Sequence, residues 1–248
     1  MASALTAGST MRLKDKVVCI TGAGRGLGLS LARAFDAEGA RLALAARTAA
    51  EIDEAAEACS DAIAVQTDVR VHSEVRALVE ATLGEFGRLD VFINNAGLAI
   101  YGPVGSYSPD EVDLLVDTNL KGVIWGSQEA LAAMKGNRDG MIVNIGSVAG
   151  TMVLPNESVY SATKWAVRGY THVLWQEARK FGVKVVSVCP GGINTPFWRT
   201  QEYLPFPDKF DPERDFLDPD EVARGVVEIC CNSAGYAVTE VVMQPVLF

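Results

Sequence analysis

The sequence predicts an α/β fold in which helices cover both faces of one parallel sheet of about seven strands. Short apolar runs rich in Val and Ile alternate along the chain with longer segments of helical periodicity, which is typical of consecutive βαβ units. The chain has 248 residues, of which 49% are hydrophobic and 21% are charged. This length and composition suit one globular domain with a well-buried core. We therefore expect a single Rossmann-type, doubly wound domain.

The strands and helices are assigned from the pattern of apolar residues. A short, continuous apolar run indicates a strand that is buried on both faces of a parallel sheet. A longer segment whose apolar residues recur at helical spacing indicates a helix between two such strands. The expected strands are residues 16–20, 41–45, 62–66, 91–94, 141–145 and 184–189, with a shorter one at 238–243. The expected helices are residues 27–39, 49–59, 71–86, 109–133, 158–181 and 219–230.

Two stretches of the chain lie outside this pattern. Residues 195–217 are dense in Pro, Phe, Trp and charged side chains. A long irregular connection in a compact domain is usually a lid or a binding loop, so we expect a substrate loop here. The alternative is a surface excursion packed by its own aromatic residues. Residues 1–10 precede Met11, which resembles a natural start, so we expect a disordered extension followed by one domain at 11–248.

Charge and cysteine usage disfavour several classes of function. The net charge of −9 argues against nucleic acid or an anionic membrane as a partner, because both require clustered Lys and Arg. The five cysteines are scattered without CxxC spacing and there are two histidines, so we expect neither a disulfide framework nor a metal site. No signal-peptide pattern or apolar run of membrane-spanning length is present, which favours a cytoplasmic protein.

A glycine-rich turn follows the first expected strand and opens the first helix. Its sequence at 21–28 is Thr-Gly-Ala-Gly-Arg-Gly-Leu-Gly. Glycines at 22, 26 and 28 let the backbone approach a pyrophosphate, and the helix N-terminus offers it unpaired N–H groups. Close packing of the helix on the sheet also selects glycine, which leaves a purely structural alternative. The position directly after the first strand favours a dinucleotide site.

The residues after the second and third strands indicate which dinucleotide binds. A site for NAD(H) presents an acidic side chain to the ribose 2′-hydroxyl, whereas this chain has Arg47 there. Arg47 and Arg25 can both bind a 2′-phosphate, so we expect NADP(H). The alternative is that both arginines are solvated surface charges. Asp68 is expected either to accept a hydrogen bond from the adenine amino group or to cap the next helix.

Three polar residues in the second half of the chain form a candidate acid–base group. Tyr160 and Lys164 are four residues apart, which on a helix places both side chains on one face. A neighbouring ammonium lowers the pKa of a tyrosine, as general acid–base chemistry requires. Ser147 follows the expected strand 141–145, at the edge where open α/β sheets bind ligands, and can donate a hydrogen bond to a carbonyl oxygen. An exposed helical Tyr and Lys is the alternative.

Several motifs together resemble the classical short-chain dehydrogenases/reductases, from Arg12 to about Val246. The motifs occur in the order and at the spacing of that family. They are TGxxxGxG at 21–28, NNAG at 94–97, NLKG at 119–122, NIGS at 144–147, YxxxK at 160–164 and PGGINT at 190–195. The resemblance implies an oxidoreductase that moves a hydride between the pro-S face of a reduced nicotinamide and a carbonyl/alcohol pair.

The resemblance also implies a role for each motif residue. Tyr160 exchanges a proton with the substrate oxygen, and Ser147 orients and polarises that oxygen. Lys164 holds the nicotinamide ribose and tunes Tyr160, while Asn119 supports a water that links Lys164 to solvent. Asn95 lines the cofactor, with tying the strand ends together as the structural alternative. The implied cofactor contacts are Gly22, Gly24, Arg25, Gly26, Leu27, Gly28, Arg47, Asp68, Val69, Asn95, Ala96, Gly97, Tyr160, Lys164, Pro190, Gly191, Ile193 and Thr195.

The end of the chain bears on the substrate class. Many ketoacyl reductases of this family carry an Asp-Gly turn after the last strand, whereas this chain continues Thr-Glu-Val-Val-Met-Gln-Pro at 239–245. That ending is more similar to NADP-dependent carbonyl reductases and 3-hydroxy acid dehydrogenases, so we expect a ketone or aldehyde as substrate. The alternatives are a 3-oxoacyl thioester reductase, an NAD-dependent alcohol dehydrogenase, and a non-catalytic nucleotide-binding sensor or scaffold.

The expected substrate pocket is apolar, which favours an uncharged or hydrophobic carbonyl compound. The cationic side chains of Lys209 and Arg214 in the expected substrate loop keep a carboxylic acid as an alternative substrate. Members of the family are usually tetramers or dimers, so we expect a homotetramer or homodimer, with 109–133 and 158–181 as candidate interface helices. The expected pocket residues are Leu98, Ala99, Val148, Asn156, Phe197 and Trp198.

Overall fold

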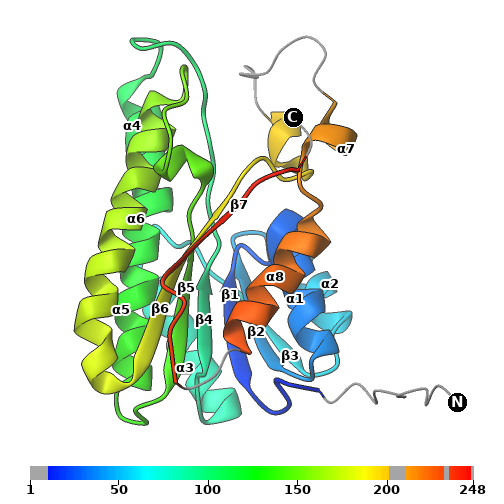
Figure 1. The fold of residues 1–248 in the computed structure, drawn as a ribbon. Helices are drawn as coiled ribbons and strands as arrows, with labels where there is room; N and C mark the ends of the chain where they lie inside the picture. Colours follow the sequence, from blue (N-terminus) through cyan, green and yellow to red (C-terminus); the bar gives the residue numbers. More distant parts are fainter. Residues whose placement is uncertain (1–10, 201–210, 232–234, 247–248) are drawn as a thin grey trace, which may run out of the picture.

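One twisted sheet lies between two layers of helices (Figure 1). The structure is a computed structural model, and it describes residues 11–200, 211–231 and 235–246. The sheet has seven strands in the order β3-β2-β1-β4-β5-β6-β7, and all its pairings are parallel. The predicted doubly wound α/β fold is therefore confirmed. The strands are β1 (Val17–Thr21), β2 (Arg41–Ala46), β3 (Ala62–Gln66), β4 (Val91–Asn94), β5 (Gly140–Ile145), β6 (Val183–Pro190) and β7 (Glu240–Met243).

The helices cover the sheet in two groups. Helices α1, α2 and α8 pack on one face, and α3, α5 and α6 pack on the other (Figure 1). Pro109 and Pro219 each begin a helix after a side-chain cap from Ser108 or Asp218, as expected for proline in a first turn. The helices are α1 (Gly26–Ala37), α2 (Ala49–Glu57), α3 (His72–Phe86), α4 (Pro109–Val116), α5 (Gly122–Met134), α6 (Ser158–Ala178), α7 (Pro212–Asp215) and α8 (Pro219–Cys230).

Both faces of each central strand are buried, which explains why the strands read as continuous apolar runs. In β1, Val18 and Ile20 belong to the core on the α1 and α8 side, whereas Val17 and Cys19 belong to the core on the α3 and α5 side. All five residues of β1 are buried. A central strand of a parallel sheet has no solvent face, so no polar alternation is left in its sequence.

The order of the strands creates a crevice at one edge of the sheet. β1 pairs with β2 on one side and with β4 on the other. The chain therefore leaves β1 toward β3 and then crosses back over β1 to form β4. The loops after β1 and β4 turn to opposite sides, and ligands of open α/β sheets bind in the crevice between such loops.

The segment 109–133 differs from the single helix that the sequence predicts. The structure has α4, a π-helical turn at Asp117–Lys121, and then α5, which ends at Met134. A π-turn inserts one extra residue into the helical path and is common at functional sites. Here the turn carries Asn119, whose side chain is fully buried and hydrogen-bonds the backbone of Leu98. The expectation of one regular helix was wrong because this local widening has no periodicity signal.

The other predicted elements are present, with ends that differ by at most two residues, except that the helix predicted at 158–181 ends at Ala178 and is followed by a 3₁₀ turn at Arg179–Phe181. The expected extension at 1–10 lies outside the described residues. Of the expected substrate loop, the structure describes a short 3₁₀ helix at Pro196–Thr200 and the segment around α7, while 201–210 lie outside the described part. In the part of the chain that the structure covers, no helix has the length and apolar character to cross a bilayer.

Candidate active site

A cavity of about 820 Å³ opens at the carboxyl ends of the strands. It runs from the glycine turn after β1 and the loop after β2 to the loops after β4, β5 and β6. Its volume lies within the range of small-molecule and cofactor sites. All the expected cofactor contacts line this cavity, and Ser147 lines it too. The strand topology therefore brings together residues that lie far apart in the sequence.

The glycine turn forms one end of the cavity. Gly22 and Gly26 have φ angles of 66° and 55°, in the left-handed region that favours glycine. A side chain at Gly28 would place its Cβ 2.0 Å from the carbonyl oxygen of Gly22, so close packing also requires glycine there. The N-cap residue of α1, Arg25, makes no side-chain capping hydrogen bond. The first-turn N–H groups of α1 thus remain available to an anion, which fits the phosphates of a dinucleotide.

Asn95 ties the end of β4 to the glycine turn. Its side-chain amide donates to the carbonyl oxygens of Thr21 at 2.9 Å and Gly22 at 3.1 Å. In return, the hydroxyl of Thr21 accepts hydrogen bonds from the backbone N–H groups of Asn95 and Ala96. The side chain of Asn95 therefore ties the ends of β1 and β4 together, as the structural alternative stated. Asn95 also lines the cavity, so the same residue holds the glycine turn in place and borders the cavity.

The side chain of Asn94 lies in the protein interior and forms hydrogen bonds with other buried side chains. Its side-chain amide donates to Asn144 at 2.8 Å and to Ser127 at 3.1 Å, and the amide of Asn144 donates to Thr171 at 2.9 Å. All these groups are buried. A satisfied buried network fixes the relative positions of β4, β5, α5 and α6 without contacting a ligand.

Charged side chains mark the end of the cavity beyond the glycine turn. Arg25 and Arg47 are exposed and line it, as expected for groups that bind a phosphate. The carboxylate of Asp68 accepts hydrogen bonds from the guanidinium and the backbone N–H of Arg70. The pairing with Arg70 holds the pKa of Asp68 below its ordinary value, against the effect of burial. Asp68 does not cap α3, whose N-cap residue is Val71.

Glu51 also lines this end of the cavity, and the sequence patterns did not point to it. It lies in the first turn of α2, and its carboxylate would be 3.0 Å from a Cβ added at Gly24. The spacing of four residues between Arg47 and Glu51 was the available signal. That spacing predicts a place for Glu51 in the site only together with the start of α2 beside the glycine turn, which the structure shows.

Ser147, Tyr160 and Lys164 meet at the other end of the cavity. Ser147 follows β5 and caps a 3₁₀ turn at Val148–Gly150 by accepting a hydrogen bond from the N–H of Ala149. Tyr160 and Lys164 lie on α6 and are 8% and 7% exposed. The amine of Lys164 lies 5.7 Å from the ring centroid of Tyr160 and donates to the carbonyl oxygen of Ile145 at 3.1 Å. The alternative of an exposed Tyr and Lys is wrong.

The pKa of Tyr160 differs from the expectation. Burial raises it above the ordinary value, and a hydrogen bond with Ser147 acts in the opposite direction. Lys164 does not offset the burial, because its amine lies over the ring and bonds Ile145 instead of the phenol oxygen. Burial also lowers the pKa of Lys164 to about 8. In this geometry the phenol holds its proton, so Tyr160 is set up to donate rather than to remain ionised.

Asn119 is buried behind the cavity and does not line it. Its amide oxygen accepts from the N–H of Leu98 at 2.9 Å, and its amide nitrogen donates to the carbonyl oxygen of Leu98 at 2.8 Å and to Thr163 at 3.2 Å. These bonds connect the loop after β4 to α6. Asn119 therefore positions the wall of the site in this structure.

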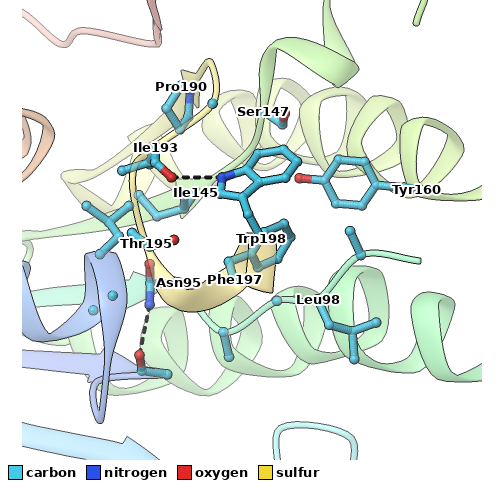
Figure 2. A pocket seen from close by; sticks show the side chains of 18 of the residues that line it. Asn95, Leu98, Ile145, Ser147, Tyr160, Pro190, Ile193, Thr195, Phe197 and Trp198 are labelled. Carbon is cyan, nitrogen blue, oxygen red and sulfur yellow. Dashed lines mark hydrogen bonds between the residues drawn. The ribbon is translucent and has the colours of Figure 1, made fainter. Parts of the chain in front are cut away.

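Aromatic side chains form the wall next to Tyr160. Tyr101 packs edge-on against Tyr160 with ring centroids 5.6 Å apart and stacks with Trp198 at 5.8 Å. Trp198 also stacks with Phe216 at 4.7 Å, and its indole N–H donates to the carbonyl oxygen of Ile193 at 2.8 Å. Figure 2 shows the hydroxyl of Tyr160 pointing toward the Trp198 indole, with Ser147 nearby. Phe197, Trp198 and Phe216, from the described parts of the irregular stretch, thus belong to the wall at this end of the cavity.

Most of the expected substrate pocket is present in this wall. Leu98, Ala99, Val148, Phe197 and Trp198 line the cavity. Asn156 was expected there but does not line it; its carbonyl oxygen instead accepts from Gly102 and Tyr107 in a strained turn with φ of 65°. Further lining residues were missed because no motif contains them. They are Tyr101, Met152, Leu154, Pro155, Glu157 and Phe216.

The sequence of this chain is similar to that of a known protein family. Residues 16–203 match the family model described as short chain dehydrogenase. An uncharacterized oxidoreductase of Staphylococcus aureus strain MW2 is 36% identical over 236 residues, which cover 94% of this chain and 99% of the relative. An uncharacterized oxidoreductase of Staphylococcus saprophyticus is 34% identical over 240 residues, covering 94% of this chain and 97% of the relative.

Solved structures agree with this assignment. An alcohol dehydrogenase from the archaeon Thermococcus sibiricus, complexed with 5-hydroxy-NADP, has a TM-score of 0.85 and 27% identity and covers 94% of this chain and 97% of its own. A 3-ketoacyl-(acyl-carrier-protein) reductase from Brucella melitensis, complexed with NADH, has a TM-score of 0.85 and 29% identity and covers 94% and 98%. The chain therefore belongs to the short-chain dehydrogenase/reductase family and is an oxidoreductase of that family.

Proposed function

We propose that this protein uses NADP(H) to interconvert a ketone or aldehyde and the corresponding alcohol, with Tyr160 as the general acid and base. The observation that carries the proposal is the shared cavity. Tyr160, Ser147 and Lys164 lie at one end of it, and the glycine turn with the uncapped start of α1 lies at the other. A dinucleotide that spans the cavity reaches from phosphate-binding groups to acid–base groups, as a hydride-transfer site requires.

The side chains divide the proton chemistry between them. In the direction of reduction, the phenol of Tyr160 donates its proton to the substrate oxygen, and the hydroxyl of Ser147 donates a hydrogen bond to the same oxygen. When bound, the nicotinamide supplies or accepts the hydride. The amine of Lys164, when protonated, favours the phenolate that remains after the proton has left. In the direction of oxidation each of these proton movements is reversed.

The preference for NADP(H) is supported by the charges at the far end of the cavity. Arg25 and Arg47 approach it from the glycine turn and from the end of β2, and a 2′-phosphate can pair with both guanidinium groups. Related structures are complexed with 5-hydroxy-NADP, NADP or NADH, which fits a nicotinamide cofactor in general. The two arginines are the reason to favour the phosphorylated form.

Titration of the protein with NADPH and with NADH, followed by the fluorescence of the reduced nicotinamide, tests the cofactor. We expect tight binding of NADPH and weaker binding of NADH. A panel of aldehydes and ketones, followed by NADPH consumption, then tests the reaction. Binding of neither nucleotide would support the scaffold alternative, and preference for NADH would favour an NAD-dependent alcohol dehydrogenase.

A further inference from the structure

A buried carboxyl group lies in the substrate end of the cavity, outside the acid–base group. Glu157 directly precedes α6, is 6% exposed and lines the cavity. It precedes Tyr160 by three residues, and residues at this spacing are neighbours on one face of a helix. Glu157 therefore borders the space in which a substrate must lie to reach the hydroxyl of Tyr160.

The carboxylate of Glu157 has no protein partner in the described ranges 11–200, 211–231 and 235–246. Its side chain makes no capping hydrogen bond to α6 and joins no ion pair there. The charge of Glu157 acts on the phenols of Tyr101, Tyr107 and Tyr160, which are all neutral at pH 7. Lys164 lines the same cavity, and its amine donates a hydrogen bond to the carbonyl oxygen of Ile145. A buried charge without a partner is costly, so a ligand that supplies one gains affinity.

The electrostatic state of Glu157 agrees with this geometry. Burial alone raises its pKa to about 7. With a pKa close to neutral pH, the carboxyl group of Glu157 ionises when a cation binds beside it and stays protonated when an anion does. Glu157 in turn raises the pKa values of Tyr101 and Tyr160, which indicates that it acts on the same small volume as the acid–base group.

The rings around this space form an apolar wall beside the carboxyl group of Glu157. Tyr101 and Trp198 stack at 5.8 Å, and both line the cavity together with Glu157. Because Trp198 also stacks on Phe216, the ring faces lie mostly against one another and contribute a wall of low polarity, in which a hydrogen bond to a charged group is stronger than in water. A carboxylate beside aromatic rings favours a cationic amine over a neutral hydroxyl, because the hydrogen bond to it is charge-assisted.

We propose that Glu157 is a specificity-determining residue that binds a cationic amino group of the substrate, so the preferred substrates are carbonyl compounds or alcohols that also carry an amine. This inference rests on the proposed function for the reacting carbonyl, but the amine site itself needs no turnover. The amine lies a few bonds from the reacting carbon, which matches the spacing of about 5–6 Å between neighbouring positions on a helix face. Carboxylate substrates are disfavoured by the same group.

Three methyl ketones of equal length test the preference. One ends in a diethylamino group, the second has carbon in place of that nitrogen, and the third ends in a carboxylate. We expect the wild type to use the amine with a kcat/KM at least about tenfold above that of the carbon analogue, mainly through KM, and to use the carboxylate poorly. Glu157→Gln removes the charge at constant shape and brings the ratio of amine to carbon analogue close to one. The ratio is unchanged in Glu177→Gln, a matched loss of charge at an exposed position of α6 that does not line the cavity.

Binding of phenylethylamine, followed by tryptophan fluorescence, measures the amine site without hydride transfer. The amine stays protonated over the range tested, so its affinity for the wild type should fall as the pH drops through about 7 and Glu157 becomes protonated. Phenylethanol, the neutral analogue, should show no such fall. A wild type that does not distinguish amine from carbon analogue, or a Glu157→Gln variant that keeps the preference, overturns the proposal. Amine binding with no turnover of any ketone instead counts against the proposed function alone.

Discussion

The amine of Lys164 donates a hydrogen bond to the carbonyl oxygen of Ile145 at 3.1 Å, which joins α6 to the last residue of β5. Ser147 follows that strand by two residues, so one contact sets the distance between the two elements that carry the acid–base group. The bond also explains the position of the amine over the Tyr160 ring, at 5.7 Å from its centroid.

Lys164 makes the free energy of unfolding rise with pH. Burial lowers its pKa from 10.5 to about 8, so between these values the unfolded chain binds more protons at this position than the folded chain. The cost of burying the charged amine is fully present below about pH 8 and disappears toward pH 10.5. In Lys164→Met this contribution is absent.

Urea unfolding at about pH 7 and about pH 10 measures this contribution. Between the two, the unfolding free energy of the wild type should rise relative to that of Lys164→Met by up to about 3 kcal/mol. Other tyrosines and cysteines that titrate at high pH affect both proteins, so the difference isolates Lys164. Parallel pH dependences in the two proteins would mean that the folded amine keeps an ordinary pKa.

Tyr160→Phe should lower kcat by a factor of about 10²–10⁴ while leaving the affinity for NADPH within a few-fold of the wild type. The ring that packs against Tyr101 stays in place, and only the hydroxyl that carries the proton is removed. Steady-state kinetics and a fluorescence titration measure the two effects. Tyr170→Phe, a half-buried position of α6 outside the cavity, is the matched control and should keep its rate. A Tyr160→Phe enzyme with most of its activity would remove Tyr160 from the proton transfer.

Arg47→Ala should weaken NADPH binding by roughly 10- to 100-fold and NADH binding much less. A guanidinium that pairs with a 2′-phosphate contributes a charge-assisted hydrogen bond that NADH cannot make. The dissociation constants of both nucleotides, measured at one ionic strength, give the answer. Arg33→Ala removes an exposed arginine of α1 that does not line the cavity and should leave both constants unchanged. Equal losses for NADPH and NADH would mean that Arg47 does not contact the 2′-phosphate.

The sequence predicts the cofactor end of the cavity more fully than the substrate end, for a physical reason. The conformation of a turn and the face of a helix depend on residues close together in the sequence, such as the glycines at 22, 26 and 28 or the pair Tyr160 and Lys164, so a short motif predicts them. The aromatic wall arises from contacts between distant segments, such as Tyr101 with Trp198, which no short motif records. Likewise the pKa of Tyr160 depends on burial and on where the Lys164 amine points, and neither is visible in the YxxxK spacing.

Asn119→Ala should lower the free energy of unfolding by about 1–3 kcal/mol, because the substitution leaves part-buried backbone groups of Leu98 without the partners that they have in the wild type. The loop after β4 then loses its link to Thr163 on α6, so KM should rise together with the loss of stability. Chemical denaturation and steady-state kinetics measure the two changes. Asn137→Ala, at an exposed position, should change stability by less than about 0.5 kcal/mol. Loss of rate without loss of stability would instead favour the role in a water relay.

Two glycine-to-alanine substitutions separate the packing of the phosphate turn from the general cost of glycine in a helix. Both glycines lie in helices, Gly28 in α1 and Gly84 in α3. A Cβ at Gly28 would lie 2.0 Å from the carbonyl oxygen of Gly22 and 2.7 Å from the Asn95 side chain, whereas a Cβ at Gly84 meets nothing within 4 Å. Gly84→Ala should therefore stabilise the protein by about 0.5–1 kcal/mol, since alanine loses less backbone entropy on folding.

Gly28→Ala should have the opposite effect, because the turn must move away from the new methyl group and the contacts that hold Asn95 must change with it. We expect both a lower free energy of unfolding and a loss of NADPH affinity of at least about tenfold, since the moved backbone carries the N–H groups that face the phosphates. Denaturation and nucleotide titration of the pair measure this. If Gly28→Ala binds NADPH as the wild type does, the first turn of α1 does not form the phosphate site.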